Sequence, residues 1–186
     1  MSLVERFAEY ATTFEGVAVG DAAPPLSRER MRELVEAYAR AKSAADVAGA
    51  LAVCHRDFEL ETVSFGLTAR GRAEAELQLH AFFHAFPDYG VTVDDFAFGE
   101  GLVGCWGRAE MTMRGEILGI PPTGRRVSLP FFSAFGFRDG LVSSERFFFD
   151  LAALCTGIGV PVDTLLEALA PLRADEGGRG ASVDAA

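Results

Sequence analysis

The chain has 186 residues and a formal net charge of −10, from 17 basic and 27 acidic residues. This length suits a single domain with a sizeable core. So acidic a surface lacks the basic footprint that nucleic-acid binding requires, and it repels anionic membranes. No apolar run reaches the ~18 residues of a membrane span, and the first residues lack the apolar centre of a secretory signal. We therefore expect a cytoplasmic protein with neither a nucleic-acid nor a membrane partner.

Three cysteines, Cys54, Cys105 and Cys155, lie far apart in the sequence, and none belongs to a CxxC pair. Zinc sites and disulfide frameworks use cysteines at short, repeated spacings, so neither is expected here. We predict three reduced thiols that are mostly buried, and no metal site.

The first part of the chain is predicted to be mainly helical. Apolar residues at helical spacing indicate helices over residues 3–12, 28–42 and 44–53. Ser27 is expected to cap the second of these, whose apolar face includes Tyr38. A strand is predicted next, over residues 57–65, in which apolar side chains and Thr62 alternate with glutamates.

The second part of the chain changes from helical to strand periodicity. A helix over residues 71–86 comes first, and a final helix is predicted near residues 163–172. Between them, alternation with a period of two predicts strands over residues 91–98, 102–113, 126–137 and 141–149. The Asp139-Gly140 pair favours a tight hairpin between the last two strands.

This order of elements predicts an α+β fold in which helices cover one face of an antiparallel sheet. If the sheet is strongly curved it forms a cone, and the mouth of the cone is a natural pocket. We expect an N-terminal helical extension and loop (1–27), the cone domain (28–160), a C-terminal helix (161–173) and a disordered tail (174–186).

Three motifs support this fold by resemblance. They are HAFPDY (84–89), GIPPTGRRV (119–127), and FRDGLV with ERFFFDLAALCTGIG (137–159). Their order and spacing resemble the SnoaL-like polyketide cyclases, within the nuclear-transport-factor-2-like fold. The resemblance covers about residues 28–160. It implies a cone-shaped pocket for hydrophobic small molecules, chemistry by proton transfer without a cofactor, and frequent dimerisation.

The resemblance also shows where this chain departs from its family. The cyclases act with an aspartate near the end of the last strand, and that position is Phe147 here. The closing aspartate, Asp150, is expected to cap the following segment. Ser133 takes the place of the cyclase histidine, and Thr62 lies roughly where ketosteroid isomerases have their general base. The usual acid and base are therefore missing.

Alternation along residues 102–113 decides which side chains face the pocket. The Arg-x-Asp pair of epoxide hydrolases aligns with Gly107 and Ala109, unless a one-residue shift presents Arg108 and Glu110 instead. We prefer the unshifted alignment, which places Trp106 outside. In this alignment the side chains that form the pocket wall are small and apolar. The expected substrate-binding residues are Thr62, Cys105, Met111, Met113, Ser133 and Phe147.

His80 and His84 are the leading candidates for a general base, because imidazole titrates near neutral pH. They lie four residues apart and share a helix face, although that face could equally be exposed to solvent. Tyr38 is the candidate hydrogen-bond donor to a substrate oxyanion, with simple core packing as the alternative. His55, Tyr89 and the Glu145–Arg146 pair are interpreted as surface or rim residues; the list of predicted catalytic residues is therefore His80, His84 and Tyr38.

Seven phenylalanines on the last two strands point alternately to both faces of the sheet. One set can line the pocket, while the other leaves an apolar outer face that favours a subunit contact. We predict a homo-oligomer, most simply a dimer. The function expected is a cofactor-free isomerase, cyclase or lyase acting on a hydrophobic, aromatic or polycyclic small molecule. The alternative is a non-catalytic protein that binds such a molecule in the same cone.

Overall fold

A computed structural model describes residues 26–180 of the chain, with side chains up to residue 174. The helix predicted over residues 3–12 lies outside the described residues. The helices are α2 (Arg28–Ser43), α3 (Val47–Ala52), α4 (Gly71–Ala85), α5 (Leu151–Ile158) and α6 (Val162–Gly180), with a short 3₁₀ turn, η2 (Val63–Phe65). The strands are β1 (Cys54–Thr62), β2 (Leu67–Arg70), β3 (Gly90–Phe98), β4 (Leu102–Thr112), β5 (Arg126–Arg138) and β6 (Leu141–Phe149).

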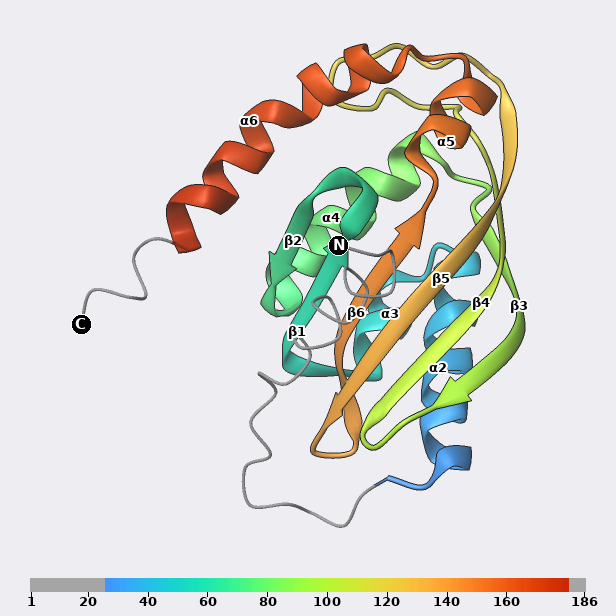
Figure 1. Cartoon of the computed structure of the whole chain (residues 1–186), viewed down its shortest axis with the longest axis vertical. Helices are drawn as coiled ribbons and strands as arrows, with labels where there is room; N and C mark the ends of the chain where they lie inside the picture. Colours follow the sequence, from blue (N-terminus) through green and yellow to red (C-terminus); the bar gives the residue numbers. More distant parts are fainter. Residues whose placement is uncertain (1–25, 181–186) are drawn as a thin grey trace, which may run out of the picture.

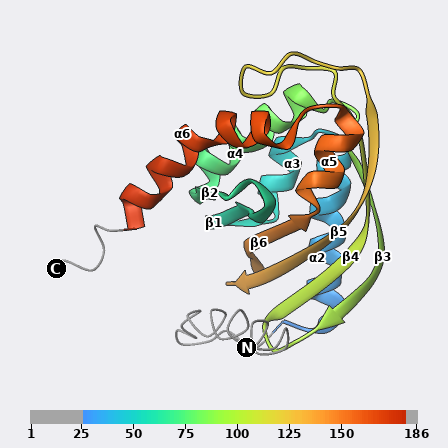
Figure 2. The ribbon, with the colours of Figure 1, turned by 45° about the horizontal axis from the view of Figure 1, so that its top comes forward.

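The six strands form one curved, open sheet in the order β2-β1-β6-β5-β4-β3 (Figure 1). The sheet curves around helices α2, α3 and α4 (Figure 2), which confirms the predicted α+β cone. One prediction was wrong: the sheet is not entirely antiparallel, because β1 pairs in parallel with β6, placing Leu60 opposite Glu145. Strand β2 was not predicted, since its four residues are too few to show a period.

Local sequence signals explain where the helices begin. The Ser27 side chain accepts a hydrogen bond from the Arg30 amide at 3.1 Å, as its predicted cap role requires. Asp150 accepts one from the Ala153 amide at 2.9 Å. Each cap satisfies an N–H group that has no partner inside the helix. Asp150 is therefore a helix cap, as predicted.

The β5–β6 hairpin has the turn that its sequence predicts. Asp139 and Gly140 both have positive φ angles, 52° and 77°. A two-residue turn with this handedness matches the twist of the flanking strands, and aspartate followed by glycine adopts it readily. The hairpin fixes the register that brings Ser133 opposite Phe147.

Strand β4 settles the alternation predicted for residues 102–113. Cys105, Ala109 and Met111 are buried, whereas Trp106 is 39 % exposed. Arg108 and Glu110 are exposed, so the predicted direction of the side chains on this strand is confirmed. No larger side chain fits at position 107 without a shift of the backbone. A Cβ atom there would lie 1.9 Å from the Thr92 carbonyl oxygen of β3.

Helix α6 lies beyond the cone and contributes to its core through Leu165 and Leu169, which are 0 % and 1 % exposed. It continues to Gly180, past the predicted end of the helix at residue 173. Between residues 26 and 180, no single helix has the length and apolar character needed to cross a membrane. Only Leu151–Ile158 and Val162–Ala174 together reach that length and composition, and they are bent by 117°.

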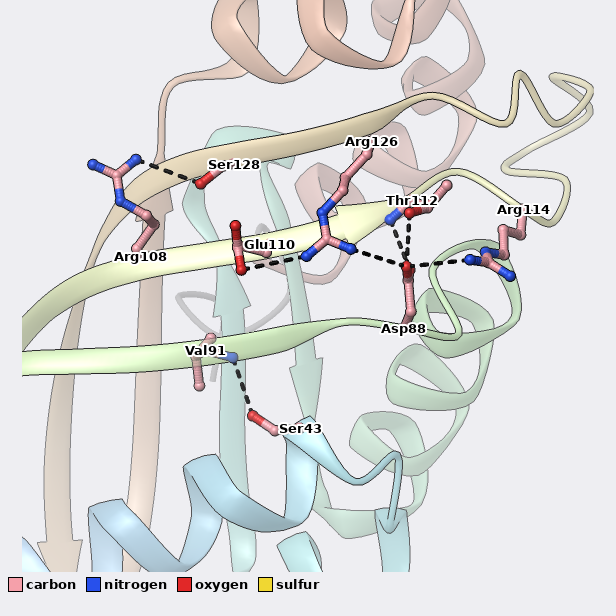
Figure 3. A network of polar contacts seen from close by, with 9 residues as sticks. All are labelled: Ser43, Asp88, Val91, Arg108, Glu110, Thr112, Arg114, Arg126 and Ser128. Carbon is pink, nitrogen blue, oxygen red and sulfur yellow. Dashed lines mark hydrogen bonds and ion pairs between the residues drawn. The ribbon is translucent and has the colours of Figure 1, made fainter.

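At one end of β4 and β5, Asp88 ties three chain segments together (Figure 3). Its carboxylate accepts hydrogen bonds from the Thr112 amide and hydroxyl, both at 2.7 Å. The guanidinium groups of Arg114 and Arg126 each approach it at 3.8 Å. Partial burial alone would raise the pKa of Asp88, but the Thr112 hydrogen bonds and Arg114 together hold that pKa below its ordinary value.

Asp88→Asn is expected to reduce stability at neutral pH, by about 1 to 2 kcal/mol. The pKa of Asp88 is lower in the folded than in the unfolded state, so its contribution is present above the unfolded pKa and is lost as pH falls through the folded pKa. Urea unfolding at neutral pH and at about pH 3 should therefore show a difference between wild type and variant that shrinks in acid. Asp94→Asn, at an exposed β3 position, is the matched control. An equal loss at both pH values would contradict the assignment.

Candidate functional site

A cavity of about 690 Å³ opens between α4, β1, β2 and α6. This volume is typical of pockets that hold small organic molecules. Its walls are mainly apolar, and the apolar residues that form them include Leu60, Phe65, Leu67, Leu79, Phe82, Phe147, Phe149 and Leu169. Polar side chains, among them Thr62 and Gln78, interrupt these walls.

Lys42 connects the main cavity to a group of buried polar side chains that we call the Glu145 cluster: Tyr38, Lys42, Ser133 and Glu145. The Glu145 carboxylate accepts hydrogen bonds from the Tyr38 hydroxyl at 2.8 Å and the Ser133 hydroxyl at 3.1 Å. The Lys42 ammonium donates to both carboxylate oxygens, at 3.0 and 3.3 Å. Glu145 is only 2 % exposed. A charge buried this deeply is costly unless it is paired and hydrogen-bonded, and this carboxylate is both.

Helix periodicity and strand register bring the Glu145 cluster together. Tyr38 and Lys42 lie one turn apart on α2, so they project from the same face. Glu145 on β6 faces the same side as Phe147, which pairs with Ser133 of β5. The contacts of Tyr38 and Lys42 with Glu145 join positions more than 100 residues apart in sequence. The cluster therefore exists only in the folded protein.

Three aromatic rings surround the Lys42 ammonium. Its Nζ atom lies 4.9 Å from the ring centroid of Tyr38, 5.2 Å from that of Phe147 and 6.0 Å from that of Tyr89. Ring faces attract a cation, particularly where water is largely absent. The ion pair with Glu145 and these rings hold the ammonium in one place. Lys42, Tyr89 and Phe147 line both the main cavity and a void of about 20 Å³ behind it.

Tyr38 and Tyr89 are both buried, and both stay protonated. Burial first, and the negative charge of Glu145 second, raise the pKa of each phenol well above its ordinary value. Tyr38 uses its proton to bind Glu145. The Tyr89 hydroxyl has no hydrogen-bond partner among the described residues, where every fully buried side-chain nitrogen or oxygen has one. The Tyr89 oxygen therefore reaches open space in the cavity.

The predicted catalytic histidines lie in different environments. His84 lines the mouth of the cavity. The side chain of His80 is 64 % exposed, lies 3.9 Å from Glu76 and does not line the cavity. The structure therefore brings His84, but not His80, to the same cavity as Lys42 and Tyr89.

The predicted substrate-binding residues also separate into groups. Thr62 lines the main cavity and accepts a hydrogen bond from the Gln78 amide at 3.0 Å. Cys105 and Ser133 line the small void, and Phe147 lines both spaces. Met111 and Met113 are buried, at 4 % and 0 % exposure, but line neither space.

The three cysteines are free and buried, as predicted. Burial, reinforced by the charge of Glu145, raises the pKa of the Cys54 and Cys105 thiols to about 12. A thiol in this state is a poor nucleophile at neutral pH. No cluster of three or more His, Cys, Asp or Glu side chains suited to a metal ion occurs within the described part of the chain.

Three interpretations of polar residues were wrong. Glu145 is not a strand-surface residue, because it alternates with Arg146; only Arg146 faces outward, where it pairs with Glu61. Tyr89 is not at the rim: it is 3 % exposed and packs against Phe82. His55 is not in a surface turn, because β1 begins at Cys54 and leaves His55 only 8 % exposed.

Sequence reasoning missed Lys42, Tyr89 and Glu145 as site residues, although two signals were present. Glu145 falls in the same alternating set as Phe147, so a carboxylate occurs on an apolar strand face. Lys42 lies four residues after Tyr38, on the apolar face of α2. An acid and a base that each interrupt an apolar face are a signal of a buried ion pair.

Comparisons with known proteins agree with this architecture. The family model described as SnoaL-like polyketide cyclase matches residues 32–158. No curated protein sequence matches the chain.

Several solved structures are similar to this chain. A candidate SnoaL-like polyketide cyclase from Jannaschia sp. CCS1 shares 25 % identity with a TM-score of 0.66, over 76 % of this chain and 99 % of that one. AclR, a candidate hydroxylase from Streptomyces galilaeus, shares 23 % identity with a TM-score of 0.62, over 73 % of this chain and 100 % of that one. An epoxide hydrolase of the LEH-like type from M. tuberculosis shares 18 % identity with a TM-score of 0.57, over 70 % of this chain and 90 % of that one. The last two show a common fold.

Proposed function

We propose that this chain, which belongs to the SnoaL-like polyketide cyclase family, is an enzyme. It converts an apolar small molecule by proton transfer inside the cone. One observation carries the proposal: Lys42, which is paired with the buried Glu145 carboxylate, lines a mainly apolar cavity. The family and its neighbours include cyclases and other small-molecule enzymes. An aromatic or polycyclic compound suits the apolar walls.

The chemistry follows from the charges that face the cavity. A base removes a proton from a carbon next to a carbonyl group, and the electron pair moves to the carbonyl oxygen. Lys42 is placed to stabilise the resulting oxyanion, because its ammonium is fixed before the reaction in a site with little water. His84, which lines the same cavity as Lys42, is our candidate base. Reprotonation at another atom, or bond cleavage or formation by the enolate, then gives an isomerase, lyase or cyclase without a cofactor.

In this proposal Tyr38 is not the direct hydrogen-bond donor to the substrate oxyanion that the sequence suggested. Its hydroxyl donates to Glu145 at 2.8 Å and does not line the main cavity. We propose that Tyr38 positions Glu145, and through it Lys42. Thr62 and Phe147, which line the main cavity, are the predicted contacts with the body of the substrate.

His84→Gln is expected to slow proton transfer by about 100-fold, because it removes the general base. The measurement is deuterium incorporation from D₂O into β-tetralone, a fused bicyclic ketone with acidic C–H bonds, followed by proton NMR. Wild type should accelerate the exchange above the buffer rate. His80→Gln is the matched control, since His80 occupies the same helix outside the cavity, and it should leave the rate unchanged. Equal rates for the two variants would contradict the assignment of His84.

The second candidate function is binding without conversion. It is favoured by Phe147, which occupies the position of the family's catalytic aspartate. A binding protein would hold β-tetralone with a measurable affinity but leave its exchange at the buffer rate. The NMR experiment therefore separates the two functions.

We also propose a homodimer formed through the outer face of the sheet. Trp106, Phe132 and Phe148 lie side by side on β4, β5 and β6, and the first two are 39 % and 42 % exposed. Exposed apolar groups of this size commonly mark contacts between subunits. Two copies that share this face would bury both sets of rings.

Phe132→Glu is expected to convert a dimer of this 19.9-kDa chain into monomers, because a carboxylate at the centre of a self-complementary contact meets its own copy. Light scattering coupled to size-exclusion chromatography measures the mass. Leu118→Glu is the control, since Leu118 is equally exposed (42 %) but lies at the cavity mouth. A monomeric wild type would contradict the proposal.

A further inference from the structure

We infer that Lys42 Nζ and Tyr89 Oη form an oxyanion-binding subsite at the inner end of the cavity. The molecule that fits it is an apolar compound with one acidic oxygen, such as a phenol, an enol or a carboxylic acid, bound as its anion. This inference rests on the proposed function, for which it names the substrate class.

Lys42 has a hydrogen-bond donor left for a ligand. An ammonium group carries three N–H donors. Glu145 takes two of them, with its oxygens at 3.0 and 3.3 Å from Nζ. Because Lys42 also lines the main cavity, its remaining N–H can point to a molecule bound there.

Tyr89 supplies a second, independent donor. The residue is 97 % buried, lines the main cavity, and its hydroxyl has no hydrogen-bond partner among the described residues. Because this hydroxyl reaches open space in the cavity, a ligand or water there can accept its proton. Since burial and Glu145 raise the pKa of Tyr89, the phenol keeps the proton that an anion would accept.

The arrangement of charges favours an anion over a neutral molecule. Glu145 lines the small void but not the main cavity. A ligand in the main cavity therefore meets the ammonium first, while the carboxylate lies behind it. The other carboxylates that line the cavity, Glu74 and Glu116, are on residues near the mouth that are partly or largely exposed. Their effect on an anion at the inner end is weakened by water.

The remaining walls select the body of the ligand. The apolar residues that line the same cavity include Leu60, Phe65, Leu79, Phe147, Phe149 and Leu169. Transfer of fused aromatic rings from water to such walls is favourable in proportion to the apolar area buried. An acidic aromatic compound satisfies both the subsite and the walls.

The test compares naphthalenecarboxylate with naphthalenecarboxamide, which has nearly the same shape but no charge. We expect isothermal titration calorimetry to show that wild type binds the carboxylate at least about tenfold more tightly. Glu145→Gln should increase this preference, because it removes the negative charge behind Lys42 while keeping a side chain of the same shape. Tyr89→Phe should weaken carboxylate binding by about threefold to tenfold.

Lys42→Met should remove the preference for the carboxylate while carboxamide binding persists, and circular dichroism establishes whether this variant is folded. If it does not fold, Glu145→Gln and Tyr89→Phe still decide the matter. Equal wild-type affinities for the two compounds, or a preference that Glu145→Gln weakens, would overturn the inference.

Failure of this inference can be told apart from failure of the proposed function. Equal affinities together with accelerated β-tetralone exchange would remove the anion subsite and leave the enzyme. A strong carboxylate preference without exchange would leave the subsite and remove the enzyme. If neither naphthalene compound binds and β-tetralone exchange stays at the buffer rate, both the subsite and the enzyme are overturned.

Discussion

Glu145→Ala is expected to lower the free energy of unfolding by about 3 to 5 kcal/mol, one of the largest effects of any single substitution in this protein. The substitution leaves the Lys42 ammonium buried without the carboxylate that pairs with it. The Lys42 side chain is only 8 % exposed. It also removes the acceptor of the Tyr38 and Ser133 hydroxyls. Each of these groups loses its partner where water cannot easily replace it.

Urea unfolding at one fixed protein concentration measures this loss, since the stability of an oligomer depends on concentration. The control is Glu110→Ala, which removes another strand carboxylate whose partner, Arg126, lies at 3.4 Å. Both side chains of that pair are about half exposed or more, so its loss should cost no more than about 1 kcal/mol. Similar losses for the two variants would show that burial of the Glu145 cluster contributes little.

A fully apolar version of the Glu145 cluster is expected to recover that stability. The variant combines Tyr38→Phe, Lys42→Met, Ser133→Ala and Glu145→Leu, which keep much of the volume and remove every charge and hydroxyl of the cluster. Replacing a buried ion pair with well-packed apolar side chains is often neutral or stabilising, by about 1 to 4 kcal/mol. We therefore expect this variant to be at least as stable as wild type, whereas Glu145→Ala is not.

Unfolding curves of wild type, Glu145→Ala and the apolar variant, recorded together, check this expectation. A stable apolar variant means that the cluster is not needed for folding. The cluster is then present for what it does in the cavity. If the apolar variant is as unstable as Glu145→Ala, the cluster is instead a structural requirement of this core.

Much of the fold could be predicted from the sequence because its signals are local. Alternation with a period of two located β3 to β6, and Ser27 and Asp150 were identified as caps from their residue type and place. The parallel pairing of β1 with β6 could not be predicted in this way. Alternation shows that a segment is a strand, but does not identify its partner.

The site was harder to predict for the same reason. Tyr38 was predicted to be either an oxyanion donor or a core residue, and its observed acceptor, Glu145, is 107 residues away in the sequence. Lys42 lies in the last turn of α2, where a basic residue is ordinary because its charge interacts favourably with the helix dipole. Its burial becomes visible only when β6 places a carboxylate 3.0 Å from Nζ. The resemblance predicts that Phe147 takes the place of the family's aspartate, and the Glu145 carboxylate lies two residues earlier on the same strand face.

The central claim is that the Glu145 cluster serves proton transfer in the cavity. The most direct test is the rate of deuterium incorporation into β-tetralone by the apolar variant of the cluster, once its folding is established. We predict that this variant exchanges β-tetralone at the buffer rate, while wild type is faster by about 100-fold or more. A folded apolar variant that matches the accelerated rate of wild type would contradict the claim.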